Sequence, residues 1–227
     1  MSLVISEVFG PTFQGEGPSA GRRAGFVRLG MCNLNCSWCD TPYSWDWDHF
    51  DRHAELRRIE LDDVLQMLSF MTVPLVVITG GEPLVQRKHL PELVHALAEH
   101  HDVEIETNGT LDPGRGFERA RFNVSPKLAN SGVSRERAWK LDVLARFALR
   151  PSTAFKFVCQ RQVDLDEVAE LVEAVGISPA SVWVMPEGRM RGTLDDRMRL
   201  LAPEVLARGW NITDRLHVKV WGDARGH

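Results

Sequence analysis

Short apolar runs alternate with helical patterns along most of this chain, and this alternation restricts the folds it can adopt. Six runs are rich in β-branched and aromatic residues and are short enough to be strands. They cover residues 25–29, 74–79, 103–107, 121–125, 154–158 and 181–185. Apolar residues recur at helical spacing over 61–70, 91–100, 134–149, 164–175 and 193–208. Strands that alternate with helices favour parallel pairing through right-handed crossovers.

The pattern predicts an α/β fold of about six parallel strands with helices outside. A complete eightfold barrel typically needs ~250 residues, so 227 residues favour an incomplete, TIM-like barrel. The sequence shows no linker, low-complexity tract or internal repeat, and we expect a single domain over residues 1–227. The closing segment 215–220 is expected to add an edge strand.

Composition narrows the class of protein. Hydrophobic residues make up 44% and charged residues 26%, which is typical of globular proteins and excludes a disordered or collagen-like chain. The 27 basic and 31 acidic residues give a net charge of −4, which offers no support for a nucleic-acid partner. No run reaches the roughly 18 apolar residues that a bilayer requires, and residues 1–10 do not resemble a signal peptide. We expect a cytoplasmic protein without a membrane partner.

Polar and glycine-containing segments follow the predicted strands, at 79–83, 106–109, 125–127 and 185–188. In parallel α/β folds the chemistry lies at the carboxyl ends of the strands, so these segments should share one rim. Glu104 and Glu106 are two residues apart, which places both carboxylates on one face of their strand. Such carboxylates need partners or a site, and Glu106 is the nearer to the rim, so we assign it to ligand contact.

Three of the four cysteines, Cys32, Cys36 and Cys39, follow the first predicted strand with the spacing C-x3-C-x2-C. Thiolates favour iron–sulfur clusters, zinc or copper(I). Three cysteines can hold three irons of a 4Fe–4S cluster and leave the fourth iron open to a small molecule. The alternative is a zinc-stabilised binding module without catalysis, in which His49 or His53 completes the site.

The cysteine spacing together with Gly80-Gly81-Glu82-Pro83 after the next strand resembles the radical S-adenosylmethionine superfamily. The resemblance implies a modified radical S-adenosylmethionine core with a 4Fe–4S cluster whose open iron binds S-adenosylmethionine. Reductive cleavage of that cofactor would give a 5′-deoxyadenosyl radical that takes hydrogen from the substrate. A glycyl-radical-enzyme activase shares this cysteine spacing and is the alternative within the superfamily.

More narrowly, the chain resembles the 7-carboxy-7-deazaguanine synthase family over nearly its whole length. The segments that carry the resemblance are 7–17, 26–30, 38–41, 106–109, 125–127, 155–158, 216–217 and 221–226. The resemblance implies conversion of 6-carboxy-5,6,7,8-tetrahydropterin to 7-carboxy-7-deazaguanine with loss of ammonia, in the biosynthesis of deazapurines such as queuosine. It also implies Mg²⁺, an electron donor such as flavodoxin or ferredoxin, and a homodimer.

The same resemblance assigns individual residues. Contacts to the pterin are assigned to Phe13, Gln14, Gly15, Glu16, Arg28, Thr79, His217 and His227. Contacts to S-adenosylmethionine are assigned to Ser37, Trp38, Cys39, Gly81, Glu82, Glu106, Ser125, Pro126, Lys127, Met185, Pro186, Glu187 and Gly188. The three clustered cysteines would ligate the iron–sulfur cluster, and the Thr41 hydroxyl would ligate Mg²⁺.

Residue chemistry is compatible with these assignments without requiring them. The Gln14 amide and the Glu16 carboxylate suit the edge of a pterin ring, and the planar fork of Arg28 suits a carboxylate. Without the family resemblance, the residues are equally compatible with a loop at 14–17 that binds no ligand and with an Arg28 that only forms a surface salt bridge.

Overall fold

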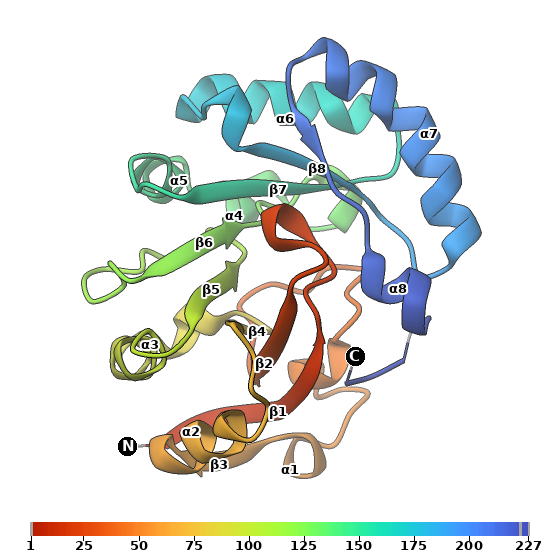
Figure 1. Cartoon of the computed structure of the whole chain (residues 1–227). Coiled ribbons are helices and arrows are strands. Elements are labelled where there is room, and N and C mark those ends of the chain that lie inside the picture. Colours follow the sequence, from red (N-terminus) through yellow and green to blue (C-terminus); the bar gives the residue numbers. More distant parts are fainter. Residues whose placement is uncertain (1, 223, 227) are drawn as a thin grey trace.

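The computed structural model of the chain describes residues 2–222 and 224–226. Its strands form one curved sheet in the order β3-β1-β2-β4-β5-β6-β7-β8-β9 (Figure 1). The strands are β1 (Ser2–Phe13), β2 (Arg23–Leu29), β3 (Arg57–Glu60), β4 (Leu75–Gly80), β5 (Asp102–Thr107), β6 (Ala120–Val124), β7 (Thr153–Cys159), β8 (Val182–Pro186) and β9 (Asn211–Ile212).

The strands β2 and β4 to β8 are neighbours and run parallel. They coincide with the six runs predicted from the sequence, and the sheet stays open between its edge strands β3 and β9. The predicted incomplete barrel is therefore confirmed. No helix within the described ranges is both long enough and apolar enough to cross a membrane.

Helices surround the outside of this sheet (Figure 1). They are α1 (Arg52–Glu55), α2 (Leu61–Ser69), α3 (Leu90–Leu97), α4 (Arg135–Ala138), α5 (Leu141–Ala148), α6 (Gln162–Val175), α7 (Arg191–Ala207) and α8 (Leu216–Trp221). The crossovers after β4, β7 and β8 use α3, α6 and α7, as the helical spacing predicted. Gly176 ends α6 in the left-handed conformation, with φ at 76°, which glycine adopts without strain.

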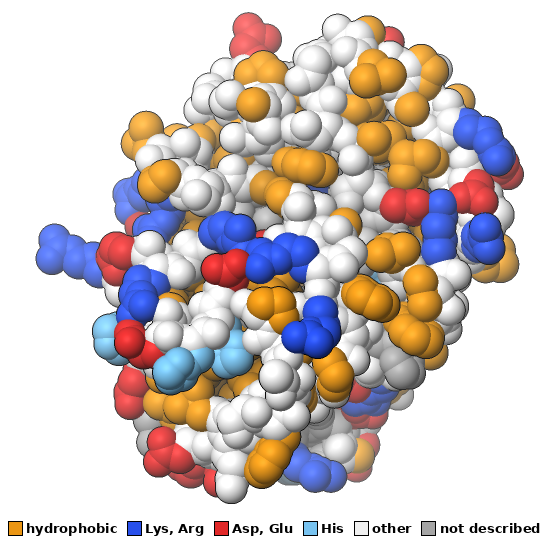
Figure 2. Space-filling view, in the orientation of Figure 1, with side chains coloured by type: hydrophobic (Ala, Val, Ile, Leu, Met, Phe, Trp, Pro, Cys, Tyr) orange, Lys and Arg blue, Asp and Glu red, His pale blue; other side chains and the backbone are white. Residues whose placement is uncertain are grey.

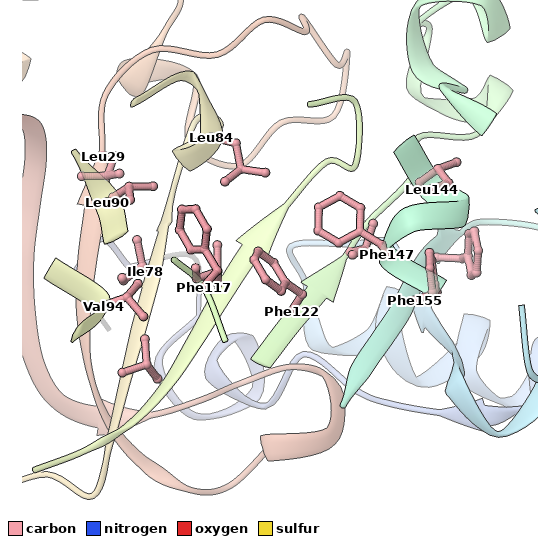
Figure 3. Close-up of a cluster of buried hydrophobic side chains, with 14 of the residues drawn as sticks. Leu29, Ile78, Leu84, Leu90, Val94, Phe117, Phe122, Leu144, Phe147 and Phe155 are labelled. Carbon is pink, nitrogen blue, oxygen red and sulfur yellow. The ribbon is translucent and has the colours of Figure 1, made fainter. Parts of the chain in front are cut away.

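The main core lies between the sheet and these helices. Phe122 of β6 contacts Phe147 of α5, with ring centroids 5.1 Å apart, and Phe117, with ring centroids 5.9 Å apart (Figure 3). Phe117 is fully buried and comes from the β5–β6 connection, which contains no helix in the described structure. Its ring supplies apolar surface where the other crossovers place a helix.

Two strands at the sheet edge were not predicted. β1 pairs antiparallel with β2 along most of its length and also with β3. Leu3 and Ile5 of β1 are buried in the main core, whereas many of its other side chains are half-buried or exposed. Buried and more exposed residues alternate only in the first half of β1. The alternation of apolar and polar residues that marks a strand is therefore short, which explains why the sequence analysis did not predict β1.

Two predicted elements differ in the structure. The helix expected over 134–149 is broken into α4 and α5, because Trp139 is extended and its indole Nε1 donates to the Lys127 carbonyl at 3.1 Å. The segment 215–220 was expected to be an edge strand, and that prediction is wrong. The edge beside β8 is taken by β9, and residues 216–221 form α8 over the rim.

Candidate active site

A single rim of the sheet carries the cavity that most of the predicted site residues share. The cavity has a volume of about 300 Å³. Of the predicted residues, the following line it: Phe13, Gln14, Gly15, Glu16, Arg28, Cys32, Cys36, Trp38, Cys39, Thr41, Thr79, Gly81, Glu106, Ser125, Lys127, Met185, Glu187 and His217. These residues follow different strands, so the predicted gathering at the carboxyl rim is borne out by the geometry.

Some predicted residues lie off the cavity wall. Among the described residues these are Ser37, Glu82, Pro126, Pro186 and Gly188. His227 lies outside the described residues. Several of the off-wall residues are neighbours in sequence of residues that do line the cavity, so the segments are placed as predicted even where a particular side chain points elsewhere.

The cysteine loop forms one wall of the cavity. Leu34 packs against Val133 and Ala138, which holds the loop to α4. Two of the sulfurs accept hydrogen bonds: Cys32 Sγ from the Leu34 N–H at 3.4 Å, and Cys39 Sγ from Trp45 Nε1 at 3.2 Å. Donors to cysteine sulfur are among the features by which proteins tune iron–sulfur clusters.

The thiols of this wall are free and partly buried. Burial raises the pKa of Cys32 to about 12 and also raises the pKa of Cys36. The Cys32 and Cys36 thiols therefore hold their protons at neutral pH until the positive charge of bound metal displaces them. In the described part of the chain, no three His, Cys, Asp or Glu side chains are grouped closely enough to hold one metal ion. Three free thiols that line one cavity fit the cysteine ligands that a 4Fe–4S cluster requires.

The glycine segment after β4 lets the cysteine loop pack closely. A Cβ atom at Gly81 would lie 2.2 Å from the Met31 carbonyl oxygen and 2.9 Å from Cys32 Cβ. Gly80 has φ at 147°, and a Cβ there would lie 2.2 Å from the Leu29 carbonyl oxygen. Only glycine fits at these two positions without displacing the backbone that carries the cysteines.

Glu82 holds the ends of two strands together. It is fully buried, and its carboxylate accepts from the Leu84 N–H, from Thr107 Oγ1 at 2.8 Å and from the Asn108 N–H at 2.7 Å. Burial raises the pKa of Glu82, and these donors oppose that shift. The side chain therefore fixes the rim between β4 and β5.

A cluster of buried charges also lines the cavity. Lys156 Nζ lies 2.6 Å from Glu16 Oε2 and 2.8 Å from Glu106 Oε2. Arg215 Nε donates to Glu16 Oε1 at 3.1 Å, and Gln14 Nε2 donates to Glu106 Oε1 at 3.2 Å. The segment that follows β1 is thus tied to β5, to β7 and to the residue that precedes α8.

The two carboxylates of this cluster have pKa values shifted in opposite directions. Burial by itself would raise the pKa of Glu16, but Lys156 and Arg215 outweigh burial and hold it well below its usual range. Burial raises the pKa of Glu106, and Lys156 offsets that only in part. Glu16 is therefore a permanent anion at neutral pH, whereas Glu106 is the carboxylate that takes up a proton more readily.

Glu104 and Glu106 share one face of β5, as their spacing predicted. Asn123 Nδ2 on β6 lies between them, 3.4 Å from Glu104 Oε2 and 3.0 Å from Glu106 Oε1. Glu104 is 2% exposed and also accepts from Ser19 Oγ. Both carboxylates therefore have partners, and only Glu106 also reaches the cavity.

The α8 segment covers one side of the cavity. The Leu216 N–H donates to the Gly15 carbonyl at 2.9 Å, and a Cβ at Gly15 would lie 1.9 Å from His217 Nδ1. Burial lowers the pKa of His217. The absence of a side chain at Gly15 is what allows the predicted histidine to approach the segment around Glu16.

An aromatic and cationic surface completes the wall. The rings of Phe9 and Phe26 stack with centroids 4.9 Å apart and an interplanar angle of 6°. The Arg28 guanidinium lies 5.3 Å from the centre of the Phe9 ring, and its Nε donates to Glu7 Oε2 at 2.9 Å. Arg28 has the salt bridge that residue chemistry allowed, and it lines the cavity as well.

Sequence reasoning missed Lys156 and Arg215 as site residues. Lys156 carried a visible signal, because it interrupts the apolar run of β7 with a charge. No sequence signal marked Arg215 as a site residue, because its neighbours in the sequence are of mixed character. It lines the cavity because of the path that the chain takes after β9.

Comparison with known proteins agrees with this geometry. Residues 27–123 match the family model of the Radical SAM superfamily, so the fold and the cysteine loop define a radical S-adenosylmethionine enzyme. The chain is 38% identical to the 7-carboxy-7-deazaguanine synthase of Pyrobaculum aerophilum, over 98% of this chain and 96% of that relative. It is 33% identical to the 7-carboxy-7-deazaguanine synthase of Rhodopirellula baltica, over 99% of this chain and 89% of that relative. The chain belongs to the 7-carboxy-7-deazaguanine synthase family.

The fold agrees with that membership. The crystal structure of QueE from Escherichia coli is 27% identical in sequence, matches with a TM-score of 0.74 and covers 95% of both chains. Membership of the superfamily implies S-adenosylmethionine and a 4Fe–4S cluster as cofactors.

Proposed function

We propose that this enzyme converts 6-carboxy-5,6,7,8-tetrahydropterin to 7-carboxy-7-deazaguanine, with one ring nitrogen released as ammonia. The observation that carries the proposal is that the three clustered cysteines and the segment from Gln14 to Glu16 line one cavity. A cofactor wall and a polar wall in the same space are what a radical reaction on a bound heterocycle requires.

The cofactors belong to the side of the cavity that carries the sulfurs. Cys32, Cys36 and Cys39 would hold the cluster, with Ser125 and Lys127 beside them for S-adenosylmethionine. The cluster and S-adenosylmethionine, when bound, supply the radical that takes hydrogen from the substrate. The chain's own part is to exclude water and to hold both ligands in fixed positions.

The pterin would lie against the opposite wall. Gln14 and Glu16 present an amide and a fixed anion, which suit the N–H donors along the edge of a pterin ring. Arg28 would bind the substrate carboxylate with the part of its fork not used by Glu7. The stacked rings of Phe9 and Phe26 add apolar surface beside it.

Further assignments belong to the same proposal. Thr41 lines the cavity and would ligate Mg²⁺ together with substrate oxygens, and Thr79 and His217 would contact the pterin. We also propose a single-domain, cytoplasmic homodimer that receives its electron from a flavodoxin or ferredoxin and whose product enters deazapurine biosynthesis.

An anaerobic turnover assay tests this function. Cluster-reconstituted protein is mixed with reductant, Mg²⁺, S-adenosylmethionine and the carboxylated pterin, and the products are followed by mass spectrometry. We expect 7-carboxy-7-deazaguanine and ammonia in excess of any S-adenosylmethionine consumed. Omitting Mg²⁺ in the presence of a chelator should slow turnover.

Two cysteine variants serve as a matched pair. Cys36→Ala should lose iron, sulfide and turnover, because it removes a ligand from the cavity wall. Cys159→Ala should keep all three, since Cys159 is buried in β7 away from the cavity. If 5′-deoxyadenosine forms and the pterin survives, the substrate assignment fails and the radical chemistry stands. A zinc-loaded protein without iron would overturn both.

A further inference from the structure

The Lys156 side chain is buried in the cavity wall with its ammonium between two carboxylates. The Nζ atom lies 2.6 Å from Glu16 Oε2 and 2.8 Å from Glu106 Oε2, and Lys156 is 4% exposed. Its neighbours in β7, Phe155 and Phe157, are buried in the main core. A lysine is seldom taken out of water unless its charge is paired, so these two carboxylates specify the position.

The two carboxylates come from segments that are far apart in the sequence. Glu16 follows β1, on the side that α8 covers. Glu106 lies near the end of β5, and two residues further on Asn108 Nδ2 donates to Asn33 Oδ1 of the cysteine loop at 2.9 Å. Lys156 therefore joins the segment that carries Glu16 to β5, and it does so beside the hydrogen bond from Gln14 to Glu106.

Each carboxylate also has a second partner, and Lys156 occupies the oxygen that this partner leaves. Arg215 takes Oε1 of Glu16, and Gln14 takes Oε1 of Glu106. A hydrogen bond between two ionised groups is roughly twice as strong as a neutral one. The ammonium is therefore a charged partner that the two carboxylates share.

We propose that Lys156 is a positioning residue that couples the two carboxylates it bridges, so that S-adenosylmethionine at Glu106 and the pterin at Glu16 raise each other's affinity. The inference rests on the proposed function, which assigns these carboxylates to those ligands. A ligand that binds one carboxylate restricts its motion and that of the ammonium bonded to it. The other carboxylate is then already ordered, so the second ligand loses less entropy when it binds.

Calorimetry on cluster-loaded, unreduced protein tests the coupling without turnover. The affinity for S-adenosylmethionine is measured anaerobically with and without the pterin, and the affinity for the pterin with and without S-adenosylmethionine. In the wild-type protein we expect each ligand to lower the Kd of the other by about fivefold or more. Linkage requires the two factors to be equal.

Lys156→Gln removes the charge and keeps hydrogen-bond donors at this position. We expect it to weaken each ligand by about tenfold, because both carboxylates lose a charged partner, and to reduce the coupling factor to about one. Lys219→Met is the matched control: Lys219 also bridges two carboxylates, Asp195 and Asp214, but it lies outside the cavity. This variant should keep the wild-type affinities and coupling.

The outcomes separate the two proposals. Pterin that fails to bind wild-type protein overturns the proposed function, and the coupling with it. Pterin that binds without changing the affinity for S-adenosylmethionine overturns the role of Lys156 alone, as does wild-type coupling in Lys156→Gln. If Lys156→Gln does not fold, Glu106→Gln, which removes the charge at one end of the bridge, is measured in its place, and wild-type coupling in that variant overturns the role of Lys156.

Discussion

Two lysines of this enzyme each bridge a pair of carboxylates, one in the cavity and one on the surface. Lys156 is 4% exposed between Glu16 and Glu106. Lys219 is 23% exposed, and its Nζ lies 2.6 Å from Asp195 and 2.5 Å from Asp214. The distances are similar, so geometry by itself does not distinguish the two bridges.

Burial makes the difference between them. At the surface, the hydrogen bond from Lys219 lowers the pKa of Asp195, and water remains available to both groups. In the cavity, burial drives the pKa of Glu106 upward while Lys156 and Arg215 drive that of Glu16 downward. Basic and acidic side chains lie beside one another at several places on the face shown in Figure 2. Breaking a charge pair is expected to cost much more stability where water is removed than at the surface.

The largest effect is expected from Lys156→Met. The substitution leaves two buried carboxylates without their shared ammonium, and we expect the free energy of unfolding at neutral pH to fall by about 3–5 kcal/mol. Anaerobic urea unfolding of the cluster-loaded protein measures it. A loss below about 1 kcal/mol is the value typical of surface pairs. It would contradict the conclusion that the buried bridge stabilises the protein more than the exposed one.

Glu82→Gln should have the next largest effect. The glutamine NH2 replaces one of the two carboxylate oxygens, so it must face either the Asn108 N–H or the Leu84 N–H and the Thr107 hydroxyl, which donate to those oxygens. We expect a loss of about 2 kcal/mol. The urea midpoint measures the change. Glu118→Gln is the control, because Glu118 accepts one backbone N–H on the exposed surface, and its midpoint should stay at the wild-type value.

Glu16 should contribute stability that depends on pH. Its pKa is lower in the folded than in the unfolded chain, so its contribution is present above the ordinary glutamate pKa of about 4.3 and is lost as pH falls below it. The stability gap between wild type and Glu16→Gln should therefore shrink as urea midpoints are measured from pH 7 to pH 3.

Glu106 provides a control, because its contribution to stability should change with pH in the opposite direction to that of Glu16. The pKa of Glu106 is raised in the folded chain, so the advantage of wild type over Glu106→Gln should fall as pH rises above about 4.3. Two variants whose gaps change in the same direction with pH would contradict the opposite shifts of this pair.

Lys219→Met should have the smallest effect. A bridge in contact with water contributes below about 1 kcal/mol, and added salt should reduce even that contribution. Urea midpoints at low and high ionic strength measure it. A loss as large as that of Lys156→Met would show that the distance between the charges, rather than burial, determines how much a bridge contributes to the free energy of unfolding.

The sequence by itself determined the parts of this protein that depend on neighbours along the chain. The six parallel strands followed from apolar runs, and the cofactor loop followed from three cysteines within eight residues. The close packing at Gly80 and Gly81 could also be predicted, because consecutive glycines after a strand indicate that another part of the backbone approaches closely. In each case the physical cause lies within a few residues.

Tertiary structure alone decided which distant residues meet. Lys156 contacts a carboxylate 140 positions earlier, and Arg215 contacts the same carboxylate 199 positions earlier. The path of the chain after β9 also turned the expected edge strand into α8, which brought His217 against Gly15. Ionisation in the cavity depends on these encounters, since burial and the distance between charges are properties of the folded chain and have no counterpart in local sequence.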